Sequence, residues 1–159
     1  MSPLGHLSIG FMAKSKATKV NVILLLTATF LIDIIYFILV GAGTSKEAIA
    51  WGHSLLAALV LTLLTFSVAW LICKNTRSAL VLALCVFSHW ILDFIVWDNL
   101  SLFVVTEHHV GLGFYTHLGI DSANPTFSKG AIITTILELS MLAFGIVVYC
   151  KNKKILKQA

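Results

Sequence analysis

Four long apolar stretches, separated by polar segments, dominate the hydrophobic pattern of the chain. Each holds about the 20 residues that a helix needs to cross a bilayer, and none contains lysine or arginine. The first stretch is too long for a signal-peptide core and contains Asp33, so we expect it to remain in the mature protein. The pattern predicts an all-α membrane protein, a single integral domain over residues 1–159 built as a four-transmembrane-helix bundle. The helices are expected at approximately residues 20–40, 50–72, 79–97 and 131–149.

The composition supports this class. Of the 159 residues, 58% are hydrophobic and 11% are charged, whereas a soluble domain carries about a quarter charged residues. A water-soluble fold of this length has too little interior to hide so much apolar surface. The net charge of +4 comes from basic residues near the ends of the stretches, where anionic lipid headgroups attract them. We therefore expect membrane lipids as partners and no nucleic acid.

The positions of the basic residues predict the orientation. They concentrate before the first stretch, between the second and third, and after the fourth. They are Lys14, Lys16, Lys19, Lys74, Arg77, Lys151, Lys153, Lys154 and Lys157. By the positive-inside rule, both termini and the loop between the second and third helices are cytoplasmic. The long loop over residues 99–130 then lies outside, and the N-terminal segment over residues 1–18 is interfacial or re-entrant.

Ionisable residues within the apolar stretches lie at a similar depth. At a rise of about 1.5 Å per residue, each lies roughly 5–12 Å below the outer end of its helix. They are Asp33, His53, His89, Asp93 and Glu138, and every stretch contributes at least one. A charged group in a helix within lipid costs about 2.5–3.5 kcal/mol on insertion scales, and such residues usually serve a function. The alternative is a set of neutral, hydrogen-bonded groups that hold the helices together.

The charges in this layer do not balance. Three carboxylates lie in the apolar stretches, and no lysine or arginine accompanies them. The acids are therefore protonated, or a cation that is not part of the chain neutralises them. Imidazole and carboxylate together are typical ligands of zinc and similar divalent ions. His89 and Asp93 are spaced i, i+4, so one helix face offers both ligands.

A second set of polar residues lies outside the apolar stretches. His6 precedes the basic segment, so it reaches an outer-half site only if the N-terminal segment re-enters the membrane. The outer loop is long, and long loops often have a function. It carries Glu107, His108, His109, His117 and Asp121, which would lie near the mouth of the site and add ligands or a general base.

With these residues identified, the chain resembles a bacterial family of predicted membrane-bound metal-dependent hydrolases of the inner membrane. The resemblance covers most of the chain and rests on short motifs around each polar residue. They are His6-Leu7-Ser8-Ile9-Gly10, Asp33, Gly52-His53-Ser54-Leu55-Leu56, Phe87-Ser88-His89-Trp90-Ile91-Leu92-Asp93 and Val110-Gly111-Leu112-Gly113. It implies a multi-pass protein of the bacterial inner (cytoplasmic) membrane that uses a divalent metal.

The order of these residues is also similar to the metal-ligand order of secreted zinc-dependent phospholipases C. There, the ions activate water for phosphodiester cleavage. The chain departs from the membrane family at one point. The family has a segment like His-Arg-Pro-Asp just after the aspartate of the third helix, whereas this chain reads Trp97-Asp98-Asn99. A ligand or substrate contact is therefore missing here or is replaced by Asp98, His108 or His109.

The sequence therefore predicts a membrane-embedded hydrolase that holds one or two divalent ions, zinc being the expected metal. The expected metal ligands are His6, Asp33, His53, His89 and Asp93, with Asp93 as the bridge if there are two ions. Glu138 and His109 are the expected catalytic residues. The metal would lower the pKa of a water toward about 7 and polarise the scissile oxygen of a lipid-like ester or phosphodiester.

The main alternative is a small ion- or proton-coupled transporter, because intramembrane acids and histidines also form ion pathways and proton relays. Four helices without a clear inverted repeat argue against it, although a homo-oligomer would supply a path. A third possibility is a small assembly subunit whose polar residues join helices. The transporter predicts protonatable acids without tightly bound metal.

Overall fold

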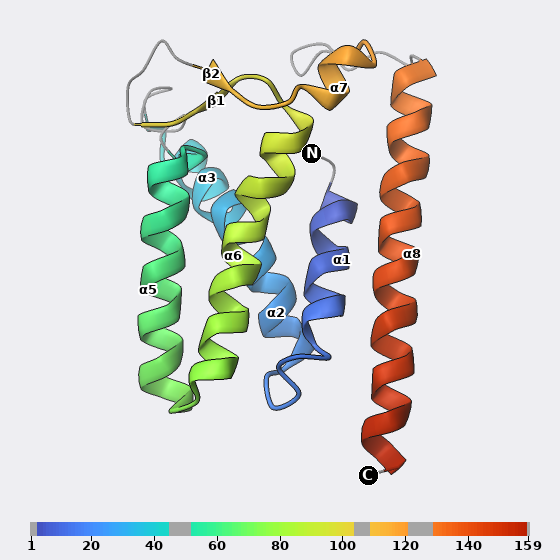
Figure 1. Ribbon diagram of the computed structural model, residues 1–159. Coiled ribbons are helices and arrows are strands. Elements are labelled where there is room, and N and C mark those ends of the chain that lie inside the picture. The colour runs from blue at the N-terminus through green and yellow to red at the C-terminus, as the bar shows by residue number, and fades with distance from the viewer. Residues whose placement is uncertain (1–2, 45–51, 104–108, 121–128, 159) are drawn as a thin grey trace.

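The computed structural model describes residues 3–44, 52–103, 109–120 and 129–158, and these form a mostly helical molecule (Figure 1). The elements, in chain order, are α1 (Pro3–Ala13), α2 (Val22–Thr29), α3 (Leu31–Gly41), α5 (Leu55–Cys73), α6 (Thr76–Val96), β1 (Leu100–Ser101), β2 (His109–Val110), α7 (Phe114–His117) and α8 (Lys129–Gln158). Most elements are helices, and two short strands and the short helix α7 lie between α6 and α8.

By length and composition, three helices in the described part of the chain can cross a membrane, namely α5, α6 and most of α8. The pair α2 and α3 makes a fourth span if the two are counted together, although they are bent by 60°. The all-α class and the membrane class expected from the sequence thus agree with the structure. The helix expected over residues 20–40 is broken into two, α2 and α3, which together can still make one bent span.

The break between α2 and α3 has a local cause. The hydroxyl of Thr29 donates to the carbonyl of Leu26 at 2.7 Å, and such back-bonding by threonine bends helices. The backbone N–H of Phe30 then bonds to the carbonyl of Thr27 at 3.1 Å, which tightens the last turn of α2. The chain restarts as α3 at Leu31 in a new direction.

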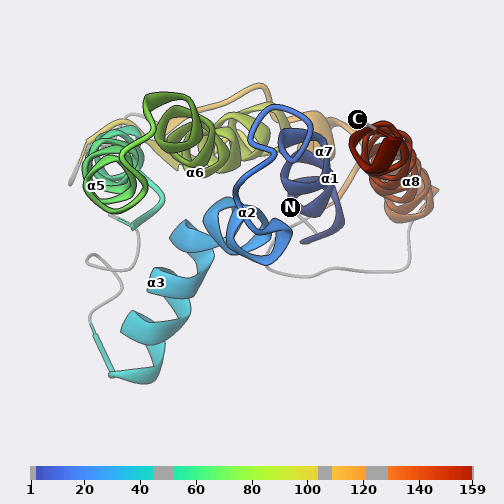
Figure 2. The same cartoon turned by 90° about the horizontal axis from the view of Figure 1, so that it is seen from below.

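The N-terminal segment forms helix α1. It is a half-length helix that packs alongside α2, α6 and α8 and turns back into α2 (Figures 1 and 2). His6 and Ser8 are buried within this packing. The segment is thus a short helix packed within the bundle, and its interfacial or re-entrant place in the membrane stays a prediction.

Close packing joins α5 to α6. Alanines on the facing sides are buried, including Ala58 on α5 and Ala79 on α6, and small residues let helices in membranes approach closely. The side chain of Asn75 accepts a hydrogen bond from the backbone N–H of Ser78 at 2.9 Å. This N-cap explains why α6 begins at Thr76, three residues before the expected start.

The segment after α6 folds over the end of that helix. Strands β1 and β2 pair in antiparallel register, with Leu100 opposite Val110. The backbone N–H of Leu112 then donates to the carbonyl of Phe94 at 2.7 Å. Gly111 has a φ of 142°, and a Cβ atom there would collide with the carbonyl of Trp97. The glycine is therefore required for the close approach that brings α7 over the helix ends.

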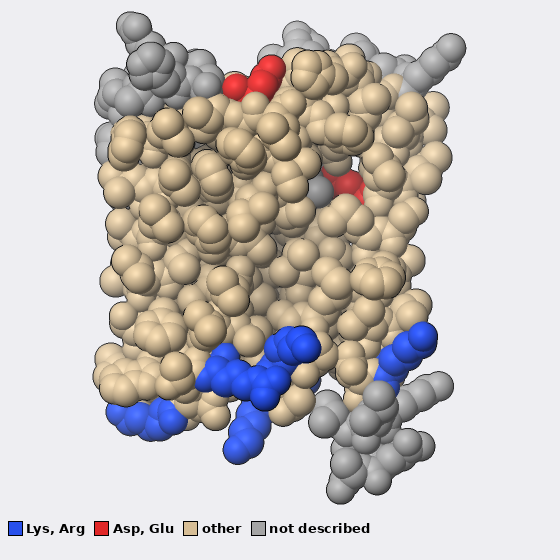
Figure 3. All heavy atoms as spheres, in the orientation of Figure 1, with Lys and Arg blue, Asp and Glu red and all other residues tan. Residues whose placement is uncertain are grey.

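Charged side chains separate along the long axis of the molecule. In Figure 3 the lysines and arginines gather at the end where α5 meets α6 and α1 meets α2. Acidic atoms appear at the opposite end and in a hollow between them on this face. Helix α8 continues to Gln158, past the expected end at residue 149. It therefore includes the basic residues that follow its apolar part.

Candidate metal centre

The five residues expected to ligate a metal come together in the structure. They come from different elements: His6 from α1, Asp33 from the first turn of α3, His53 from the turn before α5, and His89 and Asp93 from α6. Among the described residues they form two groups, each with its potential ligand atoms within 4.8 Å of one another. One group is His6, His89 and Asp93, and the other is Asp33, His53 and His89.

His89 is shared by both groups, and its orientation is fixed. Its Nδ1 lies 2.8 Å from the carbonyl oxygen of Thr29. Thr29 is the last residue of α2, and the last carbonyls of a helix have no partner within the helix. Because a carbonyl only accepts hydrogen bonds, Nδ1 must carry the proton. A neutral His89 therefore has its lone pair on Nε2.

The Nε2 of His89 faces two carboxylate oxygens. It lies 3.4 Å from Oδ1 of Asp33 and 3.2 Å from Oδ2 of Asp93. A lone pair aimed at two ionised carboxylates is unfavourable unless a positive charge lies between them. A metal ion or a proton on Nε2 supplies that charge. A ligating histidine whose other nitrogen donates to a backbone carbonyl is the usual arrangement around protein-bound metals.

The group with Asp33 and His53 is the more accessible one. The Nε2 of His53 lies 3.2 Å from Oδ1 of Asp33, and the two side chains are 24% and 30% exposed. Two ligand atoms on a tetrahedral zinc ion are roughly 3.3 Å apart, given metal–ligand distances of about 2.0 Å. The spacing around Oδ1 of Asp33 therefore fits a common ion, with room for a further ligand on the exposed side.

The group with His6 is buried. The side chains of His6 and Asp93 are 2% and 6% exposed, and Nε2 of His6 lies 3.8 Å from Oδ1 of Asp93. In the described part of the chain, neither ring nitrogen of His6 has a hydrogen-bond partner. Buried polar atoms are nearly always satisfied. The ring of His6 therefore fits a ligand role, and its ring centre lies 4.0 Å from that of His89.

The two groups cannot each use His89 at the same time. Its Nδ1 is engaged with Thr29, so the single lone pair on Nε2 completes only one of them. The residue common to both groups is thus His89, whereas the sequence pointed to Asp93 as the bridge between two ions. Bridging by Asp93 stays a prediction, because its two oxygens face different histidines.

Glu138 belongs to neither three-residue group, but it lies in a buried polar contact of its own. It is 2% exposed and accepts a hydrogen bond from the hydroxyl of Tyr115 on α7. Burial, the hydrogen bond to Glu138 and the charges of Glu138 and Asp93 raise the pKa of Tyr115. Sequence reasoning missed Tyr115, because a tyrosine in a long polar loop carries no signal of burial.

Among the outer-segment histidines whose side chains the structure describes, His117 belongs to neither group. His109 lies in β2, where its backbone pairs with that of Ser101, and its catalytic role stays a prediction. His117 ends α7 and is exposed. Three further candidates, Glu107, His108 and Asp121, lie outside the described residues.

The chain was compared with known proteins in three ways. No protein-family model matches it, and neither the curated proteins nor the solved structures include a significant match.

Proposed function

We propose that the protein is a membrane-embedded, metal-dependent hydrolase that binds a divalent ion, zinc in the first instance, through Asp33, His53 and His89. The observation that carries the proposal is the lone pair of His89, which points at the carboxylates of Asp33 and Asp93. Both acids lie in apolar stretches, residues 20–40 and 79–97, that contain no lysine or arginine. Two imidazoles and one carboxylate with an open position are a typical ligand set of catalytic zinc. The partial exposure of Asp33 and His53 supports access by water and substrate.

A bound ion would supply a water of lowered pKa and would polarise a scissile oxygen. The described side chains have distinct tasks around it. The carbonyl of Thr29 holds the ring of His89 in one tautomer. Asp93 lies against the same ring and, with His6, forms the buried side of the centre. Glu138, positioned by Tyr115, is the buried carboxylate left to accept or return a proton.

The location of the centre favours a lipid-like ester or phosphodiester as substrate. The cluster lies away from the basic turn between α5 and α6, because His53 precedes the first residue of α5 and Lys74 follows its last. If α2 and α3 count as one span, four spans with both termini and the basic end in the cytoplasm follow from the positive-inside rule. The cluster then lies in the outer half of the membrane, where the linkage of a lipid can reach it laterally. In a bacterium this is the inner membrane.

One observation also favours the transporter alternative. A proton on Nε2 of His89 would satisfy Asp33 and Asp93 as well as a metal would. An imidazolium between two carboxylates is an arrangement that proton relays use. The two functions differ in one measurable quantity, which is the amount of metal bound by the native protein.

The decisive experiment is elemental analysis of protein purified in mild detergent without chelators. We expect about one zinc or other divalent ion per chain or more, lost in His89→Ala because this ring completes either group. His53→Ala should lose the ion of the exposed group, whereas His6→Ala should retain it. The matched control is His117→Ala, which removes an exposed histidine far from both groups in sequence.

A wild-type protein without stoichiometric metal would refute the proposal and favour the proton carrier. Loss of metal in His6→Ala but not in His53→Ala would assign the ion to the buried group instead. Hydrolysis of phospholipid by the metal-loaded protein in vesicles, abolished in His89→Ala and retained in His117→Ala, would establish the activity.

A further inference from the structure

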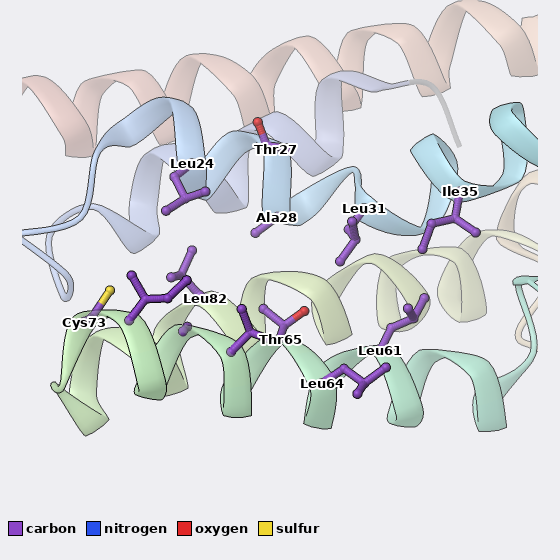
Figure 4. Close-up of a pocket in the computed structure, with 13 residues that line it drawn as sticks. Leu24, Thr27, Ala28, Leu31, Ile35, Leu61, Leu64, Thr65, Cys73 and Leu82 are labelled. Atoms are coloured by element: carbon purple, nitrogen blue, oxygen red, sulfur yellow. The ribbon is translucent and has the colours of Figure 1, made fainter.

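A groove lies between the bent pair α2–α3 and helix α5 (Figure 4). It encloses about 920 Å³ of empty space, including the part that is open to the surroundings. Its walls are apolar except for two threonines and one cysteine. The residues that matter here are Ala28, Leu31, Ile35, Leu61, Thr65 and Cys73.

The bend at Phe30 creates the groove. Helix α2 packs against α6, but α3 turns away by 60° and leaves the side of α5 uncovered (Figure 2). On α5, the rim residues Leu64, Val68 and Ile72 are more than half exposed. On the opposite wall, Leu31 and Ile35 face the same space.

The groove has the length and chemistry of a site for one hydrocarbon chain. From Leu61 to Cys73 it follows α5 for roughly 18 Å at the usual helical rise. That is longer than half of the ~30 Å hydrocarbon core of a bilayer. Because α5 crosses the membrane by length and composition, the medium that meets the groove is lipid rather than water. An apolar groove within the bilayer is filled by chains and not by water.

One end of the groove reaches the level of the metal centre. Leu31 and Ile35 line the groove, and Asp33 lies at the same level of α3, two residues from each and therefore on another face of the helix. The other end lies at Cys73, next to the basic turn between α5 and α6. A hydrocarbon chain that lies in the groove therefore ends at the level of Asp33, and its polar linkage would pass around α3 to meet the partly exposed side chains of Asp33 and His53.

We propose that this groove binds a single long hydrocarbon chain of a membrane lipid and that this lipid is the substrate of the metal centre. The second half of the statement rests on the proposed hydrolase function. The first half does not, since the apolar contacts involve none of the ligands. The chain is an acyl chain of a phospholipid, because the groove is little longer than half of the ~30 Å hydrocarbon core, which one acyl chain spans. An isoprenoid chain in its place would overturn this assignment.

The test blocks the groove with one side chain. Thr65 is half-buried in the wall, so Thr65→Trp should fill the space where the chain would lie. Ser67→Trp is the matched control, because Ser67 lies on the exposed side of the same helix and does not line the groove. Both variants gain the same ring on α5, so a fold defect caused by tryptophan alone would appear in both.

The probe is a phosphatidylglycerol with a diazirine on its acyl chain, mixed into vesicles of phosphatidylethanolamine and phosphatidylglycerol that hold the protein. After irradiation, cross-linked peptides are mapped by mass spectrometry. We expect labels concentrated on α2, α3 and the groove side of α5, reduced several-fold in Thr65→Trp and unchanged in Ser67→Trp. Equal labelling of the groove and of the exposed side at Leu63 and Ser67 would overturn the proposal.

Further outcomes separate the possible occupants and the two proposals. Native mass spectrometry should show a lipid retained by the wild type and lost from Thr65→Trp, and its mass distinguishes an acyl from an isoprenoid chain. A disulfide-linked protein dimer formed through Cys73 would instead indicate a second copy of the protein in the groove, and it would overturn the proposal. His89→Ala should keep the labelling. If the groove is labelled but the protein binds no metal, the lipid-binding site is supported and the lipid's role as substrate is refuted.

Discussion

At the scale of single residues, the centre depends on one backbone oxygen as much as on its ligands. The carbonyl of Thr29 is left without a helical partner where α2 ends, and the Nδ1 of His89 occupies it. The end of α2 at Thr29 therefore exposes the carbonyl that fixes the orientation of the His89 ring. A side-chain substitution cannot remove this acceptor, which makes the histidine itself the residue to change.

The contact between Tyr115 and Glu138 gives a prediction for stability. Tyr115→Phe keeps the ring but removes the hydrogen bond to a carboxylate that is 2% exposed. We expect a loss of about 1–3 kcal/mol in the free energy of unfolding, because a buried acceptor loses its donor. Thermal unfolding in detergent measures the effect.

The control for this prediction is Tyr149→Phe on α8. The ring of Tyr149 packs against Phe11 with ring centres 5.6 Å apart, and that contact survives the removal of the hydroxyl. Equal melting temperatures for Tyr115→Phe and Tyr149→Phe would show that the hydrogen bond contributes little.

The ionisable residues that come together in the structure could be predicted from the sequence, and their hydrogen-bond partners could not. An ionisable residue in an apolar stretch stands out, and a constant rise per residue converts its position to depth. This reasoning finds Asp33, His53, His89 and Asp93. It does not find the carbonyl of Thr29 or the hydroxyl of Tyr115, because both depend on contacts between elements that no spacing reveals.

At the scale of helices, the sequence predicts where the helices end but does not predict their directions. Hydropathy predicts how many residues are apolar, so α5 and α6 end close to their expected limits. The break at Phe30 is invisible to hydropathy, because Thr29 and Phe30 are both compatible with a straight helix. The hydropathy pattern also does not predict where α1 packs, because its position depends on how closely α8 approaches it.

That close approach gives a prediction for a glycine. A Cβ atom at Gly145 would lie 2.7 Å from the carbonyl oxygen of Ser8 and 2.8 Å from its Cα. Gly145→Ala should therefore push α1 from α8 and cost about 1–3 kcal/mol of stability, as overpacking of a tight contact does. The measurement is the melting temperature of the purified variant.

Gly41→Ala is the matched control, because nothing lies within 4 Å of a Cβ atom at Gly41. We expect this variant to melt at or slightly above the temperature of the wild type, since alanine favours the helix by about 0.5–1 kcal/mol. If both alanine variants melt together, the contact between α1 and α8 is looser than the distances indicate.

At the scale of the whole molecule, the separation of charge predicts which side each end faces. Cys73 ends α5 and Cys150 lies near the basic part of α8, and both are exposed, whereas Cys85 on α6 is buried. A membrane-impermeant maleimide should label the two exposed thiols in inside-out vesicles but not in intact cells. Variants with one cysteine each, made by replacing the others with serine, assign every label.

Labelling of Cys73 and Cys150 from opposite sides would contradict the shared end seen in Figure 1. Labelling of both in intact cells would keep the fold and invert the orientation. Cys85 serves as the internal control and should stay unmodified until the protein is denatured.

The contact between α1 and α8 joins the two far ends of the sequence. Closing so large a loop costs entropy, although the cost grows slowly with loop length, and it waits until the intervening helices are in place. Asp33, His53, His89 and Asp93 come from successive segments, so we expect them to assemble early. We expect His6 to join last, because α1 makes its most extensive contacts with α8, the final helix. During synthesis, the exposed half of the candidate centre is then expected to form before the buried half.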